Sequence, residues 1–205
     1  MSQRPCLATA AATIAALALA APAVAADCSK EVAEALAKQR TVSAMRQQTR
    51  MITERGPVDM TVDVLFPDRM HQRVKALIDP GATETILIGN RAWVSNGSSW
   101  QVVPAEEALD LSEEFQKNVV EVPKQSNRYE CDGKVQIDGR DLLAYRAVPE
   151  KGPGSGTIGI TYVDPVTGLP VRTVMATAEK PDRPFFKQEI TYSPDIKIEP
   201  PQTAN

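Results

Sequence analysis

The sequence predicts an α+β fold in which one large antiparallel sheet of about eleven strands packs against two helices. Three observations predict it. Apolar and polar residues alternate over most of the chain, which is the period of a strand with one buried face. Short turn sequences separate these segments, so successive strands pair as hairpins. Two stretches have a helical period with one apolar side. A sheet with this many strands must twist and curl.

The first 25 residues have the pattern of a secretory signal peptide. Arg4 is the only charge before Asp27, an apolar run follows, and the segment ends in the small residues Ala23-Val24-Ala25. The run is too rich in alanine, and too closely followed by a cleavage site, to favour a membrane anchor. We therefore expect residues 1–25 to be removed and the protein to be soluble in the periplasm.

The mature chain is expected to form one domain over residues 26–194, with an extended or disordered tail at 195–205. It would have 180 residues, enough to bury a sizeable core. Without Arg4 it has 22 basic and 26 acidic residues, a net charge of −4. No basic run is dense enough to indicate binding to nucleic acid or to an anionic membrane surface.

Two cysteines, Cys28 and Cys131, remain after the signal peptide. An even count in an oxidising compartment favours one disulfide bond. The alternative is two separate buried thiols. Asp27 occupies the position where a lipidated cysteine would need a small residue before it, so Cys28 is not expected to carry a lipid.

The first helix is predicted at Asp27–Lys38, because its apolar residues lie on one side and its charged residues on the other. The period then changes to two. Strands are predicted at Val58–Phe66 and Met70–Lys75, separated by the turn Pro67-Asp68.

A tight meander follows, with strands at Thr85–Ile88, Arg91–Val94 and Ser99–Val103. Asn96-Gly97 between the last two is the strongest hairpin sequence in the chain. Trp93 and Trp100 flank this turn, so the two indoles are expected to share one patch. The alternation does not settle which face of the sheet carries that patch.

The second helix is predicted at Pro104–Lys117, since proline suits the first helical position and acidic residues follow in the first turn. Strands resume near Asn127. The remaining strands are predicted at Lys134–Ile137, Leu142–Val148, Thr157–Val163, Val171–Ala178 and Phe185–Tyr192.

Residues that could carry catalysis are few. His71 is the only histidine, and its position among alternating charged residues is typical of a solvated strand face. The segment 154–159 matches GxGxxG, but a strand and not a helix is expected after it, so a phosphate site is not indicated. Carboxylates from distant segments could still meet in space. We expect no enzyme, no metal and no cofactor.

Several short sequence motifs, in their order along the chain, resemble those of the LolA-like superfamily of exported lipid and lipoprotein carriers. The resemblance covers nearly the whole mature chain. It rests on the N-terminal helix and on the phrases Phe66-Pro67-Asp68-Arg69-Met70, Thr85-Ile86-Leu87-Ile88-Gly89-Asn90 with Trp93, Ser98-Ser99-Trp100, Tyr162-Val163-Asp164-Pro165, Gly168-Leu169-Pro170 and Ile190-Thr191-Tyr192.

The resemblance implies a strongly curved, incomplete barrel with two lid helices on its concave face. It also implies transport or binding of acylated ligands in an apolar cavity. Relatives of the carrier type latch the lid with an arginine that has no evident counterpart here. The expected partners are a hydrophobic acylated ligand and a membrane-bound delivery or acceptor protein, and the chain is expected to be a monomer.

Alternation and resemblance together give the expected ligand-binding residues. They are Leu36, Met60, Val62, Val64, Ile86, Ile88, Trp93, Trp100, Leu111, Phe115, Ile160, Tyr162 and Ile190. A shift of one residue would turn a whole strand over, so the face of each strand needs the structure. The alternative function is a protein-interaction or regulatory module of the same fold, with a packed interior and no ligand.

Overall fold

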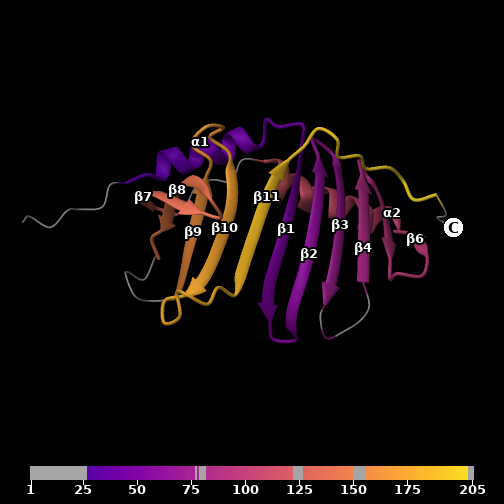
Figure 1. The fold of residues 1–205 in the computed structure, drawn as a ribbon. Coiled ribbons are helices and arrows are strands. Elements are labelled where there is room, and N and C mark those ends of the chain that lie inside the picture. Colours follow the sequence, from indigo (N-terminus) through magenta and orange to yellow (C-terminus); the bar gives the residue numbers. More distant parts are fainter. Residues whose placement is uncertain (1–26, 77, 79–81, 122–126, 150–155, 203–205) are drawn as a thin grey trace, which may run out of the picture.

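Eleven antiparallel strands form one sheet, and two α-helices pack against it (Figure 1). This computed structural model describes residues 27–76, 78, 82–121, 127–149 and 156–202, so the predicted signal peptide lies outside the described residues. The helices are α1 Ser29–Gln39 and α2 Ala105–Phe115, and α2 continues into the π-helical segment η1 Gln116–Val120. The strands are β1 Ala44–Thr53, β2 Gly56–Leu65, β3 Arg69–Ala76, β4 Ala82–Ile88, β5 Arg91–Ser95, β6 Trp100–Val102, β7 Tyr129–Ile137, β8 Arg140–Ala147, β9 Thr157–Val163, β10 Pro170–Thr177 and β11 Phe186–Tyr192.

The strand order shows two meanders joined through the first and last strands. It runs β6-β5-β4-β3-β2-β1-β11-β10-β9-β8-β7. Strands β1–β6 form one half and β7–β11 the other, and β1 pairs with β11 in the centre. The predicted α+β class, the antiparallel sheet and the two helices are therefore confirmed.

Both helices lie on the same face of the sheet, which we call the inner face; the opposite side is the outer face. Helix α2 buries Ala108 and Phe115 against Met45, Val64 and Leu87 from the β1–β4 half. Helix α1 packs on the other half, in a cluster that contains Cys28, Val32, Ala35, Tyr129, Tyr145 and Val163. The hydrophobic core is thus divided between the two helices.

Two strands differ from the sequence prediction. Strand β1 was missed, and the two strands expected between Asn127 and Ile137 form the single strand β7. A register shift between Cys131 and Gly133 interrupts the β7–β8 pairing within this single strand.

The Asp138-Gly139 turn has the positive φ values of 50° and 77° that a tight hairpin needs, as its sequence predicts. Within the described residues, none of the helices has both the length and the apolar character needed to span a membrane.

Candidate ligand-binding face

The inner face is almost free of charged side chains. Residues directly opposite each other in antiparallel strands point to the same side, so the register assigns every strand residue to a face. On β1–β6 and β9–β11 all charged residues fall on the outer face. Only Lys134 and Asp141, which pair at 2.8 Å in the β7–β8 hairpin, share the register of inner residues. A surface of this kind suits uncharged or apolar groups.

Helix α1 is fastened at both ends. The Cys28–Cys131 disulfide, as predicted, ties its start to β7, with Cα atoms 5.6 Å apart. At its end Gln39 is 3% exposed and its Nε2 donates a hydrogen bond of 3.0 Å to the Tyr192 hydroxyl. Tyr192 in turn donates to the Pro170 carbonyl, and burial raises the pKa of Tyr192 to about 12. These contacts hold α1 against the sheet.

Helix α2 is held by fewer polar contacts. Ser112 Oγ donates to Asn90 Oδ1 at 3.2 Å, and Gln116 Nε2 donates to the Pro67 carbonyl at 2.9 Å. The rest of its attachment is apolar packing. Of the two helices, α2 is therefore the better candidate for a movable lid.

A cavity of about 190 Å³ lies between α2–η1 and strand β3. It is lined by Met70, Gln72, Leu111, Glu114, Phe115, Asn118 and Val119. Ligand pockets usually measure about 300 to 1,000 Å³. This cavity is thus too small for a lipid unless α2 moves.

Apolar side chains continue along the inner face toward the β1–β2 turn. Met51, Val58, Met60, Val74 and Phe186 are half-buried there and share the inner register. Together with the cavity under α2 they form the candidate ligand-binding face.

The predicted site residues divide between the two faces. On the inner face or on the helices that cover it lie Leu36, Met60, Val62, Val64, Leu111, Phe115 and Ile190. On the outer face lie Ile86, Ile88, Trp93, Trp100, Ile160 and Tyr162.

The expected face of these last six residues is therefore wrong. Strands β4, β5 and β9 carry apolar residues on both sides, so alternation alone could not choose. Leu87 and Ala92 point inward in place of Ile86 and Trp93, and Val163 in place of Tyr162.

The two tryptophans share one patch, as expected, but on the outer face. Trp93 pairs with Val102 and Trp100 with Ser95, so the indoles are diagonal neighbours. They pack with Ile86 and with the tail residue Ile198, which is 2% exposed. Arg69 Nη1 donates to the Ile198 carbonyl at 3.2 Å. The described part of the tail is thus extended and docked over the tryptophans.

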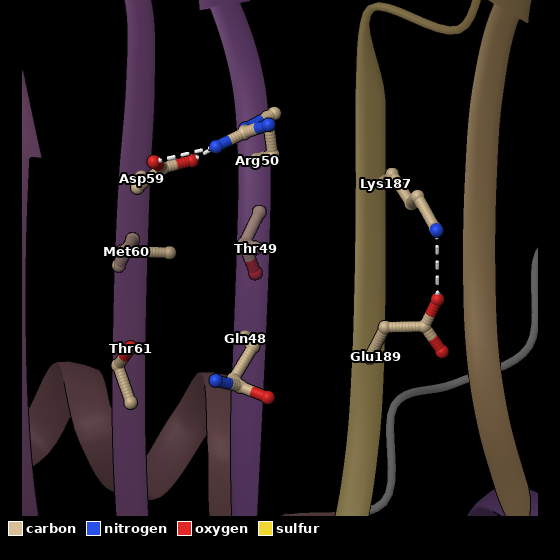
Figure 2. A pocket seen from close by; sticks show the side chains of 8 residues that line it. All are labelled: Gln48, Thr49, Arg50, Asp59, Met60, Thr61, Lys187 and Glu189. Carbon is tan, nitrogen blue, oxygen red and sulfur yellow. Dashed lines mark hydrogen bonds and ion pairs between the residues drawn. The ribbon is translucent and has the colours of Figure 1, made fainter. Parts of the chain in front are cut away.

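A hollow of about 410 Å³ lies over β2, β1 and β11, and six of its eight lining residues point to the outer face (Figure 2). Seven of its eight lining residues are polar or charged, and the charges are paired within the protein. Arg50 binds Asp59 through two hydrogen bonds of 2.7 and 2.8 Å, and Lys187 lies 3.1 Å from Glu189. Because these charged groups already neutralise each other, they provide little electrostatic attraction for a charged ligand.

A chain of ionic hydrogen bonds crosses four strands of the outer face. Asp63, 4% exposed, accepts from Arg46 at 2.5 and 3.0 Å and from Arg73 at 2.6 Å. Burial would raise the pKa of Asp63, but the two guanidinium groups outweigh it and lower the pKa. Arg73 also donates to His71 Nδ1, so His71 Nε2 carries the hydrogen that faces Glu84 at 2.7 Å. This arrangement links β1, β2, β3 and β4 through side chains on the outer face.

The described residues offer one group with metal-ligand proximity, formed by Cys28, Glu31 and Cys131. Both sulfurs belong to the disulfide, so only one carboxylate could bind an ion.

The sequence matches no family model and no curated protein. Solved structures do match. The lipoprotein LppX of Mycobacterium tuberculosis aligns over 83% of this chain and 97% of its own, with 12% identity and a TM-score of 0.55. The MucA/MucB complex of Pseudomonas aeruginosa aligns over 80% of this chain and 56% of the matched one, with 14% identity and a TM-score of 0.42. A LolA superfamily protein of Nitrosomonas europaea aligns over 82% and 93%, with 11% identity and a TM-score of 0.31.

At 12% identity the similarity to LppX concerns the fold and not the ligand. The order of strands, the two helices on one face and this alignment agree with the resemblance found in the sequence. The chain shares the α+β fold of LppX.

Proposed function

We propose that this protein is exported to the periplasm and binds or carries a hydrophobic, acylated ligand on its inner face. One observation carries the proposal: nine of the eleven strands place no charged side chain on the face that the helices cover. An ordinary core would also be uncharged under the helices. Here the uncharged surface continues beyond them, to the half-buried side chains near the β1–β2 turn.

Acyl burial is energetically sufficient for such binding. Each buried methylene contributes about 0.8 kcal/mol, so roughly ten methylenes contribute about 8 kcal/mol before the cost of association. No catalytic residue is needed. Binding would require α2 to move, because the cavity beneath it measures only about 190 Å³.

Native mass spectrometry of the mature protein, purified without detergent, tests the proposal. A discrete added mass that extracts into organic solvent as a lipid is the expected result. Protein that carries no added mass, and that takes up no lipid from vesicles, would contradict it.

Two matched variants test which face of the sheet binds the lipid. Met60 is on the inner face of β2, and the next residue, Thr61, is on the outer face. We expect Met60→Glu to reduce lipid binding at least about tenfold, since a charge would meet acyl chain. Thr61→Glu should leave lipid binding unchanged. An equal loss in both variants would mean that the binding surface is not the inner face.

A packed interior favours the second candidate, an interaction or regulatory module without a ligand. Eight buried residues from the sheet and α2, together with Val103 between β6 and α2, already form a continuous cluster beneath that helix. Retention of a fixed α2 in the presence of lipid vesicles would favour this alternative.

A further inference from the structure

A row of four hydrogen-bonding side chains crosses the uncharged inner face of β1, β11, β10 and β9. Thr49 of β1 lies opposite Gln188 of β11. Gln188 lies opposite Thr173 of β10, and Thr173 lies opposite Thr161 of β9. Four adjacent strands thus place these side chains next to each other on the same face. We call them the polar row.

Two side chains of the polar row are buried and two are half-buried. Thr49 is 3% exposed and Thr161 is 9% exposed. Burying a hydroxyl or amide costs free energy unless it is hydrogen-bonded, and valine or leucine would suit these strand positions equally well. A row of four such groups on the inner face therefore points to a ligand that hydrogen-bonds there.

The row has donors to offer. Gln188 Nε2 donates to Thr49 Oγ1 at 3.1 Å. Because Thr49 accepts in this bond, its own hydroxyl hydrogen can be donated elsewhere, and the Gln188 amide has a second N–H. Carbonyl oxygens of a ligand are matching acceptors.

The ligand group that meets the row must be neutral. The inner face of β1, β11, β10 and β9 carries no arginine, lysine or histidine, so a carboxylate or phosphate would be buried without a counter-charge. Apolar residues flank the row along β11, with Ile190 on one side and Phe186 on the other. A molecule with a polar centre and chains extending from it matches this pattern.

We propose that the polar row binds the ester carbonyl groups of a neutral acylglycerol, with the acyl chains lying along the apolar residues beside it. This inference rests on the proposed function, and it adds the class of lipid and the residues that select it.

The test compares dipalmitoylglycerol with its diether analogue, which has the same chains and hydroxyl group but no carbonyls. Protein is incubated with phosphatidylcholine vesicles that contain one of them, and the bound lipid is quantified after separation. We expect about tenfold tighter binding of the ester, the effect of one or two hydrogen bonds. Palmitate, which is anionic, should bind more weakly than the diester.

Variants assign the selectivity to the polar row. Thr49→Val and Gln188→Leu together should remove the ester preference while the ether still binds. Thr61→Val and Gln48→Leu are the matched controls, because both residues lie on the outer face, Gln48 on β1 beside Thr49 and Thr61 opposite Gln48 on β2. These controls should keep the preference.

The outcomes separate the two proposals. Equal binding of ester and ether by the unaltered protein, or stronger binding of palmitate, would overturn the inference and leave the lipid-binding function in place. A preference that survives the double variant would also overturn it. No binding of either lipid would overturn the proposed function itself.

Discussion

Asp63 shows how a buried charge is stabilised on the outer face. Its carboxylate receives hydrogen bonds from two arginines of the neighbouring strands. Those arginine side chains are 44% and 36% exposed, while the Asp63 side chain is only 6% exposed. The Asp63 carboxylate is thus the charge in this network that is shielded from water, and its ionised form depends on the two arginines for stabilisation.

Asp63→Asn is expected to lower the free energy of unfolding by about 2 to 3 kcal/mol at pH 7, since hydrogen bonds to a charged group are lost. The lowered pKa adds a pH dependence: the stabilisation is present above the ordinary value of 3.8 and is lost as the pH falls through the lower folded-state value. Urea unfolding at pH 7 and below pH 3.8 measures both effects. Asp59→Asn is the control, because its Arg50 partner is largely exposed, and it should cost under about 1 kcal/mol. Similar losses for the two variants at pH 7 would contradict this account.

Ile198 holds the tail over the two tryptophans. Its side chain is buried against Trp93 and Ile86, although it lies ten residues beyond Gln188 in a segment with no regular structure. Its own neighbours in sequence are charged and prolyl residues, so local pattern gave no sign of this docking.

Ile198→Ala should release the tail and expose the indoles to water, because the buried contact that fixes it is lost. We expect a red shift of tryptophan fluorescence and stronger quenching by acrylamide. Lys197→Ala, at an exposed position of the same segment, should leave both unchanged. Fluorescence that is the same in all three proteins would show that the tail does not cover the tryptophans in solution.

At the scale of elements, the two helices differ in how they are attached. Helix α1 has a disulfide at one end and the Gln39–Tyr192 hydrogen bond at the other. Helix α2 has two side-chain hydrogen bonds and continues into a π-helical segment. Amide hydrogen exchange should therefore be slower in α1 than in α2.

Reduction of the disulfide should make amide hydrogen exchange faster in α1 than in α2. The bond spans 103 residues, and the chain-entropy estimate for a loop of this size is about 4 to 5 kcal/mol. We expect exchange in α1 to rise on reduction and exchange in α2 to stay the same. The variant with both Cys28→Ser and Cys131→Ser is the control for effects of the reductant. A uniform rise across the chain would mean that the bond stabilises the whole fold and not α1.

Strand β1 explains why part of the sheet escaped prediction. Its inward residues are Met45, Gln47, Thr49 and Met51, and its outward residues include Arg46 and Arg50. Two of the four inward positions are polar, so the alternation of apolar and polar residues disappears there. These two residues, Gln47 and Thr49, add hydrogen-bonding groups to the inner face.

At the scale of the molecule, the fold was more predictable than the site. Turn sequences such as Asn96-Gly97 and Asp138-Gly139 fix where strands end, and two apolar helix sides fix where helices lie. A shift of one residue in the register exchanges the two faces of a strand. Turn sequences do not fix the register that closely, and the alternation gives no answer where both faces of the strand are apolar. That is why seven of the thirteen expected site residues are on the inner face or its helices, and six, including both tryptophans, are on the outer face.

The small cavity beside α2 and the attachment of the two helices together predict how a ligand would enter. The cavity between α2 and the sheet measures only about 190 Å³, so uptake depends on the fraction of molecules in which α2 has moved away. Ser112→Ala with Gln116→Ala removes both side-chain hydrogen bonds that hold α2 and should raise that fraction about tenfold. The rate of lipid uptake should rise by the same factor, with faster hydrogen exchange confined to α2. Gln39→Ala loosens α1 instead and should not speed uptake. If Gln39→Ala were the faster variant, α1 would be the moving element, and entry would occur through the β7–β11 half of the sheet.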